Sequence, residues 1–153
     1  MRFKPTSAYS SNVMFVEGDI LDEVKLRRCY FERPEVVFHL AAFFANQNSV
    51  DHPELDLQVN GMGTLRMLEY ATMCKADRFV YASSGSSIYG SLPKADPLSR
   101  LPLKEHDISL KLSTPYQCTK MIGELYCNFF LNHYGLKTSS ARFFNSYGPG
   151  EVP

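Results

Sequence analysis

A tyrosine and a lysine four residues apart, Tyr116 and Lys120, are the residues of this sequence best suited to acid–base chemistry. Residues at positions i and i+4 lie on one face of a helix, so the two side chains are within reach of each other. A nearby ammonium group favours the phenolate and lowers the pKa of a tyrosine, which lets the tyrosine act as a base near neutral pH. The chain contains nine tyrosines, so a chance match is common and the pair needs support from its surroundings.

Polar or small residues also follow two apolar runs. The segment 83–87 reads Ser-Ser-Gly-Ser-Ser, and its hydroxyl groups could bind a substrate oxygen, although a plain surface loop has the same composition. In an open parallel sheet, ligands bind beyond the carboxyl ends of the strands. Residues 39–42, His-Leu-Ala-Ala, would let a ligand approach the backbone, or would serve helix packing around a hydrogen-bonded core histidine. Asp19 could accept a hydrogen bond from an adenine or a ribose, or simply cap a turn.

Composition and motifs exclude several classes of function. Sixteen basic residues balance sixteen acidic ones, so no electrostatic footprint of a nucleic-acid or membrane-surface binder is present. No cluster has metal-ligand spacing, and neither a P-loop nor a G-x-S-x-G elbow occurs. The four cysteines have neither redox nor disulfide-framework spacing and are interpreted as buried thiols in a reducing compartment. With no apolar run long enough to cross a membrane, a cytoplasmic location is expected.

The elements that must position these residues alternate between strand and helix. Strands are predicted at residues 13–16, 36–40, 78–82 and 137–144. Helices are predicted at residues 23–31, within 53–74, and at 115–134. The continuous apolar run at 36–40 is typical of a strand buried on both faces of a parallel sheet. The sequence therefore predicts an α/β fold, with a polar, proline-rich loop over 89–112.

Local signals fix the ends of two of these helices. Asp22 is the expected N-cap of the helix at 23–31. Thr114 and Gln117 form a T-x-x-Q capping box around Pro115, and Gly135 is the expected left-handed cap at the far end of the same helix.

Several segments carry a family resemblance when they are taken in their order along the chain. They are Gly18-Asp19-Ile20-Leu21-Asp22, Val37 to Ala42, Ser49-Val50 with Pro53, Asn60 to Thr64, Phe79 to Gly90, Tyr116 to Lys120, and Arg142 to Gly150. In order and spacing they resemble the extended short-chain dehydrogenase/reductase family, the nucleotide-sugar epimerases and dehydratases that use a tightly held NAD. The match extends over almost the whole chain from Val13 to Pro153.

The resemblance implies a catalytic role for three residues. Tyr116 would take the proton of a sugar hydroxyl while hydride leaves the same carbon for NAD, and Lys120 would hold the cofactor ribose and lower the tyrosine pKa. The family's catalytic serine or threonine usually stands four residues before the tyrosine of Tyr89-Gly90, where this chain has Gly85. Ser84 takes the role if the loop carries one extra residue, and Ser86 is the second choice and otherwise a substrate contact.

Further contacts follow from the same resemblance. Asn145 resembles the family's substrate-contacting asparagine. The residues expected to contact the cofactor, besides the tyrosine and lysine, are Asp19, Ile20, Leu40, Ala41, Ala42, Asn60, Ser83 and Phe144. NAD is the expected cofactor, and NADP is not distinguished from it.

The segment after the expected catalytic serine bears on the reaction. The 4,6-dehydratases of the family carry an Asp-Glu pair there, because elimination of water needs a further acid and base, whereas this chain has no carboxylate in that segment. The resemblance therefore favours a nucleotide-sugar epimerase, of UDP-hexose type, that transiently oxidises a sugar hydroxyl. The alternatives are a non-catalytic Rossmann-like interaction module and a family reductase acting on a small carbonyl compound.

Family members begin with a strand, a G-x-x-G-x-x-G turn, a helix and a second strand, and this sequence has no such glycine pattern. Residues 1–153 would therefore form a partial NAD(P)-binding Rossmann domain, an incomplete parallel sheet lacking the first two strands and the C-terminal substrate domain. The strand at 13–16 would be orphaned and the strand at 36–40 would become an exposed apolar edge. This chain alone is expected to bind NAD weakly and to turn over nothing measurable, whereas a full-length form would be a homodimer.

Overall fold

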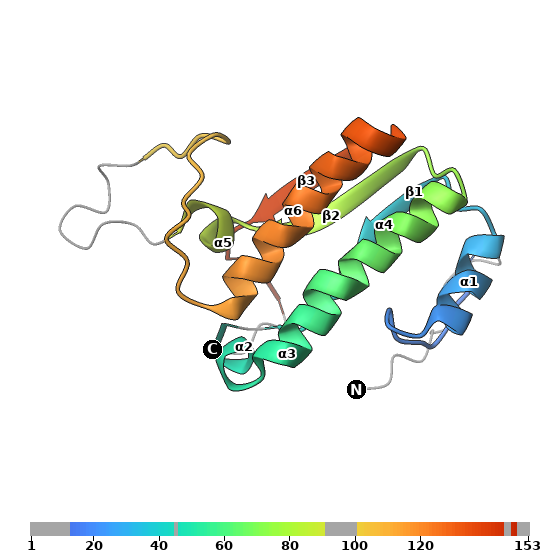
Figure 1. Ribbon diagram of the computed structural model, residues 1–153, viewed down its shortest axis with the longest axis horizontal. Coiled ribbons are helices and arrows are strands. Elements are labelled where there is room, and N and C mark those ends of the chain that lie inside the picture. The colour runs from blue at the N-terminus through green and yellow to red at the C-terminus, as the bar shows by residue number, and fades with distance from the viewer. Residues whose placement is uncertain (1–12, 45, 91–100, 146–147, 150–153) are drawn as a thin grey trace.

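The computed structural model describes residues 13–44, 46–90, 101–145 and 148–149. Three parallel strands form one sheet in the order β1 (Val36–His39), β2 (Arg78–Ser84) and β3 (Thr138–Phe143). Val37 pairs with Phe79, and Tyr81 pairs with Ser140. The long helices that connect these strands lie together on one face of the sheet, and the α/β prediction is confirmed (Figure 1).

The helix predicted between 53 and 74 is present, but its middle has a different pitch. It consists of α3 (Pro53–Asp56), a π-helical segment η1 (Leu57–Gly63) and α4 (Thr64–Met73). Such π-helical turns occur frequently at functional sites. Here the wider turn brings Asn60 inward, where its side chain is buried.

The helix at Pro115–Tyr134, α6, has the predicted ends. The Thr114 hydroxyl accepts a hydrogen bond from the N–H of Gln117 (3.3 Å), and Gly135 adopts a left-handed conformation with φ of 72°. The reciprocal bond of the capping box is displaced by one residue, because the Gln117 side chain accepts from the N–H of Ser113 (2.7 Å). Helix α1 (Glu23–Phe31) also has its predicted bounds.

The structure has no strand at Val13–Val16, so this prediction is wrong. Val13, Met14 and Phe15 are each more than 60% exposed and pair with no strand among the described residues. An isolated segment has no ladder partner and cannot form a strand, whatever its β propensity.

A second prediction, that the strand β1 is buried on both faces of the sheet, is also wrong. Its residues alternate instead: Val37 and His39 are buried under the helices, whereas Val36 and Phe38 are 43% and 66% exposed on the opposite face. The core lies only on the helix side, and among the described residues no helix covers the other. The expected apolar edge strand is confirmed by a separate observation, because β1 is the first strand of the sheet and pairs only with β2 among the described residues.

Two short helices were not expected from the sequence, α2 (Asn46–Asp51) and α5 (Gly85–Tyr89). Helix α5 occupies most of the segment interpreted as a possible serine-rich loop. Of the expected loop at 89–112, residues 91–100 lie outside the described part of the chain.

All four cysteines are free, but they are not uniformly buried. Only Cys127 is buried, and Cys118 on α6 is exposed, so the expectation of four buried thiols is wrong. No helix among the described residues is long and apolar enough to span a bilayer.

Candidate active site

Tyr116 and Lys120, here called the dyad, occupy the first turns of α6, as the sequence predicts. The Lys120 ammonium nitrogen lies 5.6 Å from the centre of the Tyr116 ring. It is directed at β2, where it donates a hydrogen bond to the carbonyl oxygen of Ala82 (2.8 Å). The start of the helix is held from the other side, because the N–H of Tyr116 donates to the Ser49 hydroxyl of α2 (3.0 Å).

The electrostatics of the dyad differ from the sequence-based expectation. Burial, and then the carboxylate of Asp56, raise the pKa of Tyr116 above its ordinary value, whereas a lowered value is expected from the neighbouring lysine. Burial also lowers the pKa of Lys120 to about 8, although Asp56 opposes that shift. The Lys120 ammonium itself faces the Ala82 carbonyl and the rings of Tyr81 and Tyr116.

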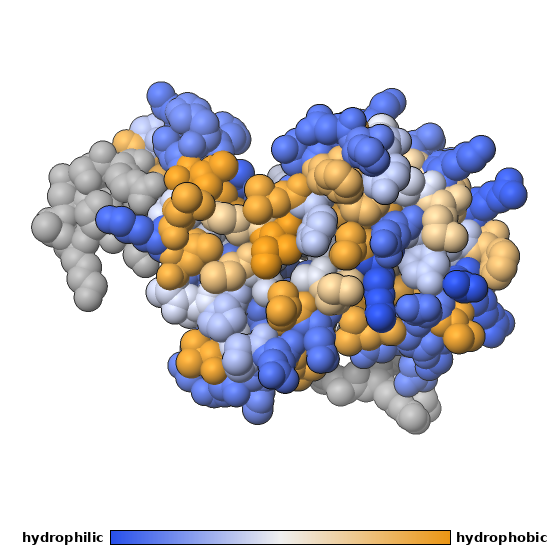
Figure 2. Space-filling view, viewed as in Figure 1, coloured by the Kyte–Doolittle hydropathy of each residue, from blue (hydrophilic) through white to orange (hydrophobic). Residues whose placement is uncertain are grey.

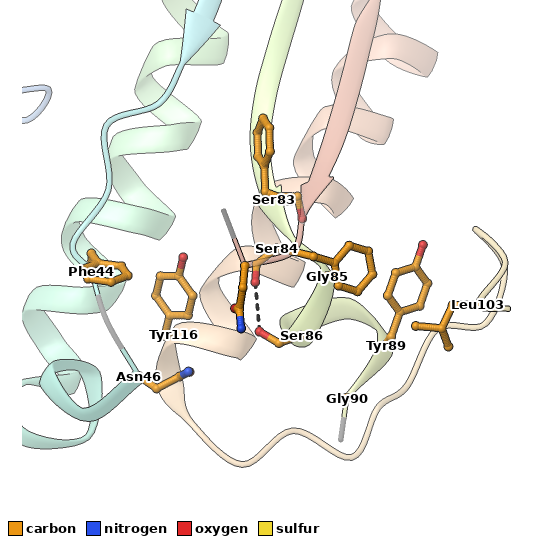
Figure 3. A pocket seen from close by; sticks show the side chains of 13 residues that line it. Phe44, Asn46, Ser83, Ser84, Gly85, Ser86, Tyr89, Gly90, Leu103 and Tyr116 are labelled. Carbon is orange, nitrogen blue, oxygen red and sulfur yellow. Dashed lines mark hydrogen bonds between the residues drawn. The ribbon is translucent and has the colours of Figure 1, made fainter. Parts of the chain in front are cut away.

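The serines at the end of β2 fall into two environments. Ser84 and Ser86 have hydroxyl oxygens 3.2 Å apart, and both face a pocket beside Tyr116 (Figure 3). Ser83 is buried, and its hydroxyl donates to the Glu124 carboxylate of α6 (2.5 Å). The Ser83 hydroxyl hydrogen is therefore used within the protein, and contact of Ser83 with the cofactor stays a prediction.

The pocket lies beyond the carboxyl ends of β2 and β3, where ligands bind in open parallel sheets. It has a volume of about 870 Å³ and brings together most of the expected catalytic and substrate residues. Of these, the pocket is lined by Tyr116, Ser84, Ser86 and Asn145, and it is also lined by Ser83 and Phe144, two of the expected cofactor contacts.

An aromatic wall closes one side of this pocket. The rings of Phe144 and Tyr89 stack with their centres 5.9 Å apart and an interplanar angle of 6°. The Phe144 ring also packs so closely on Gly85 that an added Cβ would lie 2.7 Å from it. A side chain at position 85 would therefore require the Phe144 ring to move.

The remaining expected cofactor residues lie outside this pocket. Asp19 accepts a hydrogen bond from the N–H of Leu21 (2.8 Å), which is the turn-capping alternative, and Ile20 packs against Gly63. Leu40, Ala41 and Ala42 follow the carboxyl end of β1 and are exposed, as a ligand-lining segment requires.

Asn60 holds the backbone that follows this segment. Its side-chain oxygen accepts from the N–H of Phe43 (2.8 Å), and its amide nitrogen donates to the carbonyl of the same residue (3.0 Å). Asn60 is buried and acts on the protein itself, so any influence on the cofactor passes through the chain.

Sequence reasoning missed a buried acid beneath the dyad. Asp56 is fully buried and accepts hydrogen bonds from Asn60 and Thr119, the residue before Lys120 (both 2.7 Å). The sequence does show that Asp56 stands four residues before Asn60 on a predicted helix, a spacing at which the two side chains can meet. It gives no indication of the contact with Thr119, which is 63 residues away.

A second missed network braces the far wall of the pocket. Arg142 on β3 donates from Nη2 (2.8 Å) and Nε (3.0 Å) to the Glu124 carboxylate, and from Nη1 to the Tyr89 hydroxyl (3.1 Å). A further bond joins Nη1 to the carbonyl of Glu105 (2.6 Å). The network joins α5, α6, β3 and the loop at 105.

The family model described as NAD dependent epimerase/dehydratase matches residues 2–153. The chain belongs to this family. As an epimerase/dehydratase family member it has the expected partial Rossmann sheet, since the three parallel strands superpose on family structures. Among the described residues, no group of histidine, cysteine and carboxylate side chains could hold a metal ion.

Individual relatives agree with the family match. The chain is 38% identical over 144 residues to a UDP-glucose 4-epimerase of Mycolicibacterium smegmatis, covering 94% of this chain and 44% of the relative. An epimerase structure from Methanothermobacter thermautotrophicus is 55% identical with a TM-score of 0.85, covering 95% of this chain and 41% of that one.

A Thermus thermophilus UDP-glucose 4-epimerase, solved in complex with NAD, is 33% identical with a TM-score of 0.82. That match covers 95% of this chain and 45% of the Thermus chain. This family member therefore spans less than half the length of the relatives it matches.

Proposed function

We propose that this chain is the catalytic part of an NAD-dependent nucleotide-sugar epimerase, within a partial NAD(P)-binding Rossmann domain. The observation that carries the proposal is the single pocket shared by Tyr116, Ser84 and Ser86, with Lys120 behind the tyrosine ring. An acid–base tyrosine, hydroxyl donors and a ribose-binding cation are the groups needed to oxidise and reduce an alcohol carbon reversibly. Family membership and relatives named as UDP-glucose 4-epimerases support it.

The residues fit one half of the cofactor. Lys120 would hold the nicotinamide ribose, the exposed Leu40 to Ala42 segment would line the cofactor, and Phe144 would lie near the nicotinamide. NAD, when bound, supplies reversible hydride acceptance. The pyrophosphate half needs a glycine-rich turn at a helix N-terminus, and the printed sequence contains no G-x-x-G-x-x-G. The chain alone therefore binds NAD weakly and turns over substrate below detection.

Within the site, Tyr116 takes the proton of the sugar hydroxyl and later returns it. Because burial and Asp56 hold the phenol protonated near pH 7, the ammonium of Lys120 must stabilise the phenolate for this transfer. Ser84, within hydrogen-bond distance of Ser86, donates to the same sugar oxygen and stabilises the charge that develops there. Asn145 contacts the substrate at the pocket edge.

The composition of the pocket favours epimerisation over dehydration. Elimination of water requires an acid and a base in addition to the tyrosine. Among the described residues that line the pocket there is no carboxylate, and the positions after Ser84 are Gly85 and Ser86. Oxidation to the ketone and return of hydride to the other face need no such pair. A UDP-hexose is the proposed substrate.

A chimaera tests the proposed function. Residues 13–153 replace the matching segment of the Thermus UDP-glucose 4-epimerase, which then supplies the remaining parts of the fold. We expect epimerisation of UDP-glucose that falls at least about 100-fold in the Tyr116→Phe chimaera, the usual size of a general acid–base contribution. A folded chimaera that binds NAD but is inactive, or keeps its activity after Tyr116→Phe, would contradict the proposal.

The isolated chain provides a separate test of the cofactor assignment. Calorimetric titration with NAD should give no micromolar binding, because the pyrophosphate cradle is lacking. Micromolar affinity would show that the glycine turn is dispensable. Weak binding detected at millimolar NAD should disappear in Lys120→Met and persist in the distant control Lys104→Met.

We also propose that the outward face of α6 binds a second copy of the chain, in keeping with the expected homodimer. Leu125 and Phe129 are 63% and 47% exposed, and with Ile122 and Tyr126 they line a groove of about 500 Å³. Figure 2 shows hydrophobic residues gathered over the middle of this face, where α6 runs. The four residues carry no charge, so two such faces can approach each other without repulsion.

Sedimentation of the parent chain and two variants tests this surface. Leu125→Lys should give monomers, whereas Leu110→Lys, at a loop residue that is 83% exposed, should leave the dimer intact. A dimer that survives Leu125→Lys contradicts the assignment. If Phe38→Lys on the bare face of the sheet abolishes the dimer instead, and NAD does not bind, the non-catalytic interaction module is favoured.

A further inference from the structure

Asp56 is a charged group in an unusual position. Its side chain is fully buried at the end of α3, yet no arginine or lysine forms an ion pair with it among the described residues. Both carboxylate oxygens are used: Oδ1 accepts from the Asn60 amide and Oδ2 from the Thr119 hydroxyl. A buried carboxylate is costly unless its hydrogen bonds are satisfied, and here they are.

The two hydrogen-bond partners of Asp56 lead to two different parts of the site. Thr119 directly precedes Lys120 on α6, so fixing its hydroxyl fixes the turn that carries the ammonium. Asn60 holds the backbone of Phe43 by both its N–H and its carbonyl, and Phe43 follows the exposed segment at the end of β1. Asp56 therefore joins the lysine and the expected cofactor-lining segment through one residue each.

Asp56 also acts on the dyad through its charge. The groups that face Asp56 from α6 are Tyr116 and Lys120, and the Asp56 charge raises the pKa of both. Burial raises the pKa of Asp56 itself, whereas the hydrogen bonds from Thr119 and Asn60 and the charge of Lys120 oppose that rise. On the β1 side His39 is linked to Asn60 through Thr64, whose hydroxyl donates to the Asn60 carbonyl and lies 2.9 Å from His39 Nε2. Burial and the Lys120 charge lower the pKa of His39 to about 4, so His39 is neutral near pH 7.

We propose that Asp56 is a positioning residue of the dyad: its carboxylate fixes Lys120 relative to the segment at 40–43 and supplies the negative charge that offsets burial of the ammonium. This inference rests on the proposed function for the use of the dyad in catalysis. The structural relationship itself requires no turnover, so it can be measured on the 153-residue chain.

The first test follows Lys120 by NMR in chains carrying ¹³C at the lysine ε position, with its signal assigned through Lys120→Arg. Asp56→Asn keeps the shape of the side chain and removes its charge. The Lys120 titration midpoint, about 8 in the parent, should fall in this variant. Asp22→Asn, which removes a carboxylate at the distant N-cap of α1, should leave the midpoint unchanged. An unchanged midpoint in folded Asp56→Asn overturns the proposal.

A reciprocal measurement keeps the proposal testable if the loss of a buried hydrogen-bond acceptor unfolds Asp56→Asn. In chains with ¹³C-labelled aspartate, Lys120→Met should raise the Asp56 midpoint, because the lysine charge now lowers it. Thr119→Val should also raise it by removing a hydrogen bond to the carboxylate, and Thr119→Ser should restore the parent value. An Asp56 midpoint that responds to neither Lys120→Met nor Thr119→Val refutes the coupling.

These results are independent of the proposed function. If the chimaera with the Thermus enzyme proves inactive while the midpoints shift as described, the proposed reaction fails and the role of Asp56 in positioning Lys120 stands. If the chimaera is active and the midpoints do not shift, the reaction stands and the role of Asp56 fails.

Discussion

The ammonium group of Lys120 donates a hydrogen bond to the backbone carbonyl of Ala82, with 2.8 Å between Nζ and the oxygen. Ala82 lies two residues before Ser84, so this contact ties the dyad on α6 to the strand that carries the serines, as the bond from Ser83 to Glu124 does further along the same helix. Lys120 is only 5% exposed, and its ring contacts are Tyr81 and Tyr116. The lysine of the dyad thus contacts both α6 and β2.

Burial of this ammonium predicts a rise in stability at alkaline pH. The pKa of Lys120 is about 8 in the fold and 10.5 for an ordinary lysine, so the unfolded chain binds the extra proton between those pH values. The cost of burying the charge is fully present below pH 8 and disappears as the pH approaches 10.5. The parent should therefore gain up to about 3 kcal/mol relative to Lys120→Met across this range. Urea unfolding of both chains at pH 7 and 10 measures the difference, and a difference that stays constant contradicts the prediction.

Burial of His39 predicts a loss of stability at acidic pH. It is 2% exposed, its Nε2 lies 2.9 Å from the Thr64 hydroxyl, and its Nδ1 has no hydrogen-bond partner among the described residues. Its pKa is about 4 in the fold against 6.5 ordinarily, so the unfolded chain binds a proton first as the pH falls. Stability present above pH 6.5 should be lost towards pH 4, by up to about 3 kcal/mol.

The comparison that isolates this effect is His39→Gln, whose amide can still reach Thr64 but does not titrate. Urea unfolding at pH 7 and pH 4.5 should show a larger acid loss in the parent than in the variant. Equal losses in the two chains would show that His39 becomes protonated inside the fold.

Local signals predicted much of the fold because they act within a few residues. The carboxylate of Asp22 satisfies the first N–H groups of α1, and Gly135 ends α6 in the left-handed conformation, whatever surrounds them. Helix α5 escaped prediction because it has only five residues and no visible periodicity. It is held by burial of Ile88 and Tyr89 rather than by propensity.

The sequence predicted that several of the candidate site residues lie together, but not the contacts that hold them, and their roles stay predictions. Tyr116, Ser84 and Asn145 do share a pocket, since strand ends and a helix N-terminus meet at one edge of a parallel sheet. The direction of Lys120, the hydroxyl of Ser83 and the buried Asp56 depend on contacts across 38 to 63 residues, which no local pattern encodes. Exposure of Phe38 likewise depends on which elements cover the sheet.

Close approach of α6 to β2 depends on Gly123. A Cβ added there would collide with the phenol end of Tyr81, a ring that is 1% exposed and cannot move aside. Gly123→Ala should therefore destabilise the fold by about 1–3 kcal/mol, despite the better helix propensity of alanine. Thermal unfolding measures the loss, and the double variant with Tyr81→Leu should recover part of it.

Gly61→Ala is the matched control for this substitution. Its added Cβ would lie 3.0 Å from the Cδ1 atom of Leu57, the end of a flexible side chain that can rotate away. We expect a smaller loss than for Gly123→Ala. Equal losses, or no recovery with Tyr81→Leu, would show that contact with the Tyr81 ring does not set the distance between helix and strand.

The Glu124–Arg142 pair should contribute more to stability than an exposed pair of the same chain. Both side chains are about 15% exposed, and their closest atoms, Arg142 Nη2 and a Glu124 oxygen, are 2.8 Å apart. Glu124→Gln leaves the Arg142 guanidinium with fewer acceptor oxygens. It also removes the carboxylate that accepts the hydrogen bond from the Ser83 hydroxyl. We expect a loss of about 3 kcal/mol, because removing one partner leaves the other charge in a site poor in water.

The exposed pair between Arg66 and Glu23 provides the control for this comparison, with 3.7 Å between charged atoms and side chains that are 29% and 57% exposed. Glu23→Gln should cost less than about 1 kcal/mol, and salt should abolish that cost. Hydrogen exchange adds a local measurement: because Arg142 also holds the Tyr89 hydroxyl, the amides of α5 should exchange faster in Glu124→Gln and be unchanged in Glu23→Gln. If the two variants lose the same stability, or α5 stays equally protected, Arg142 does not brace the wall of the pocket.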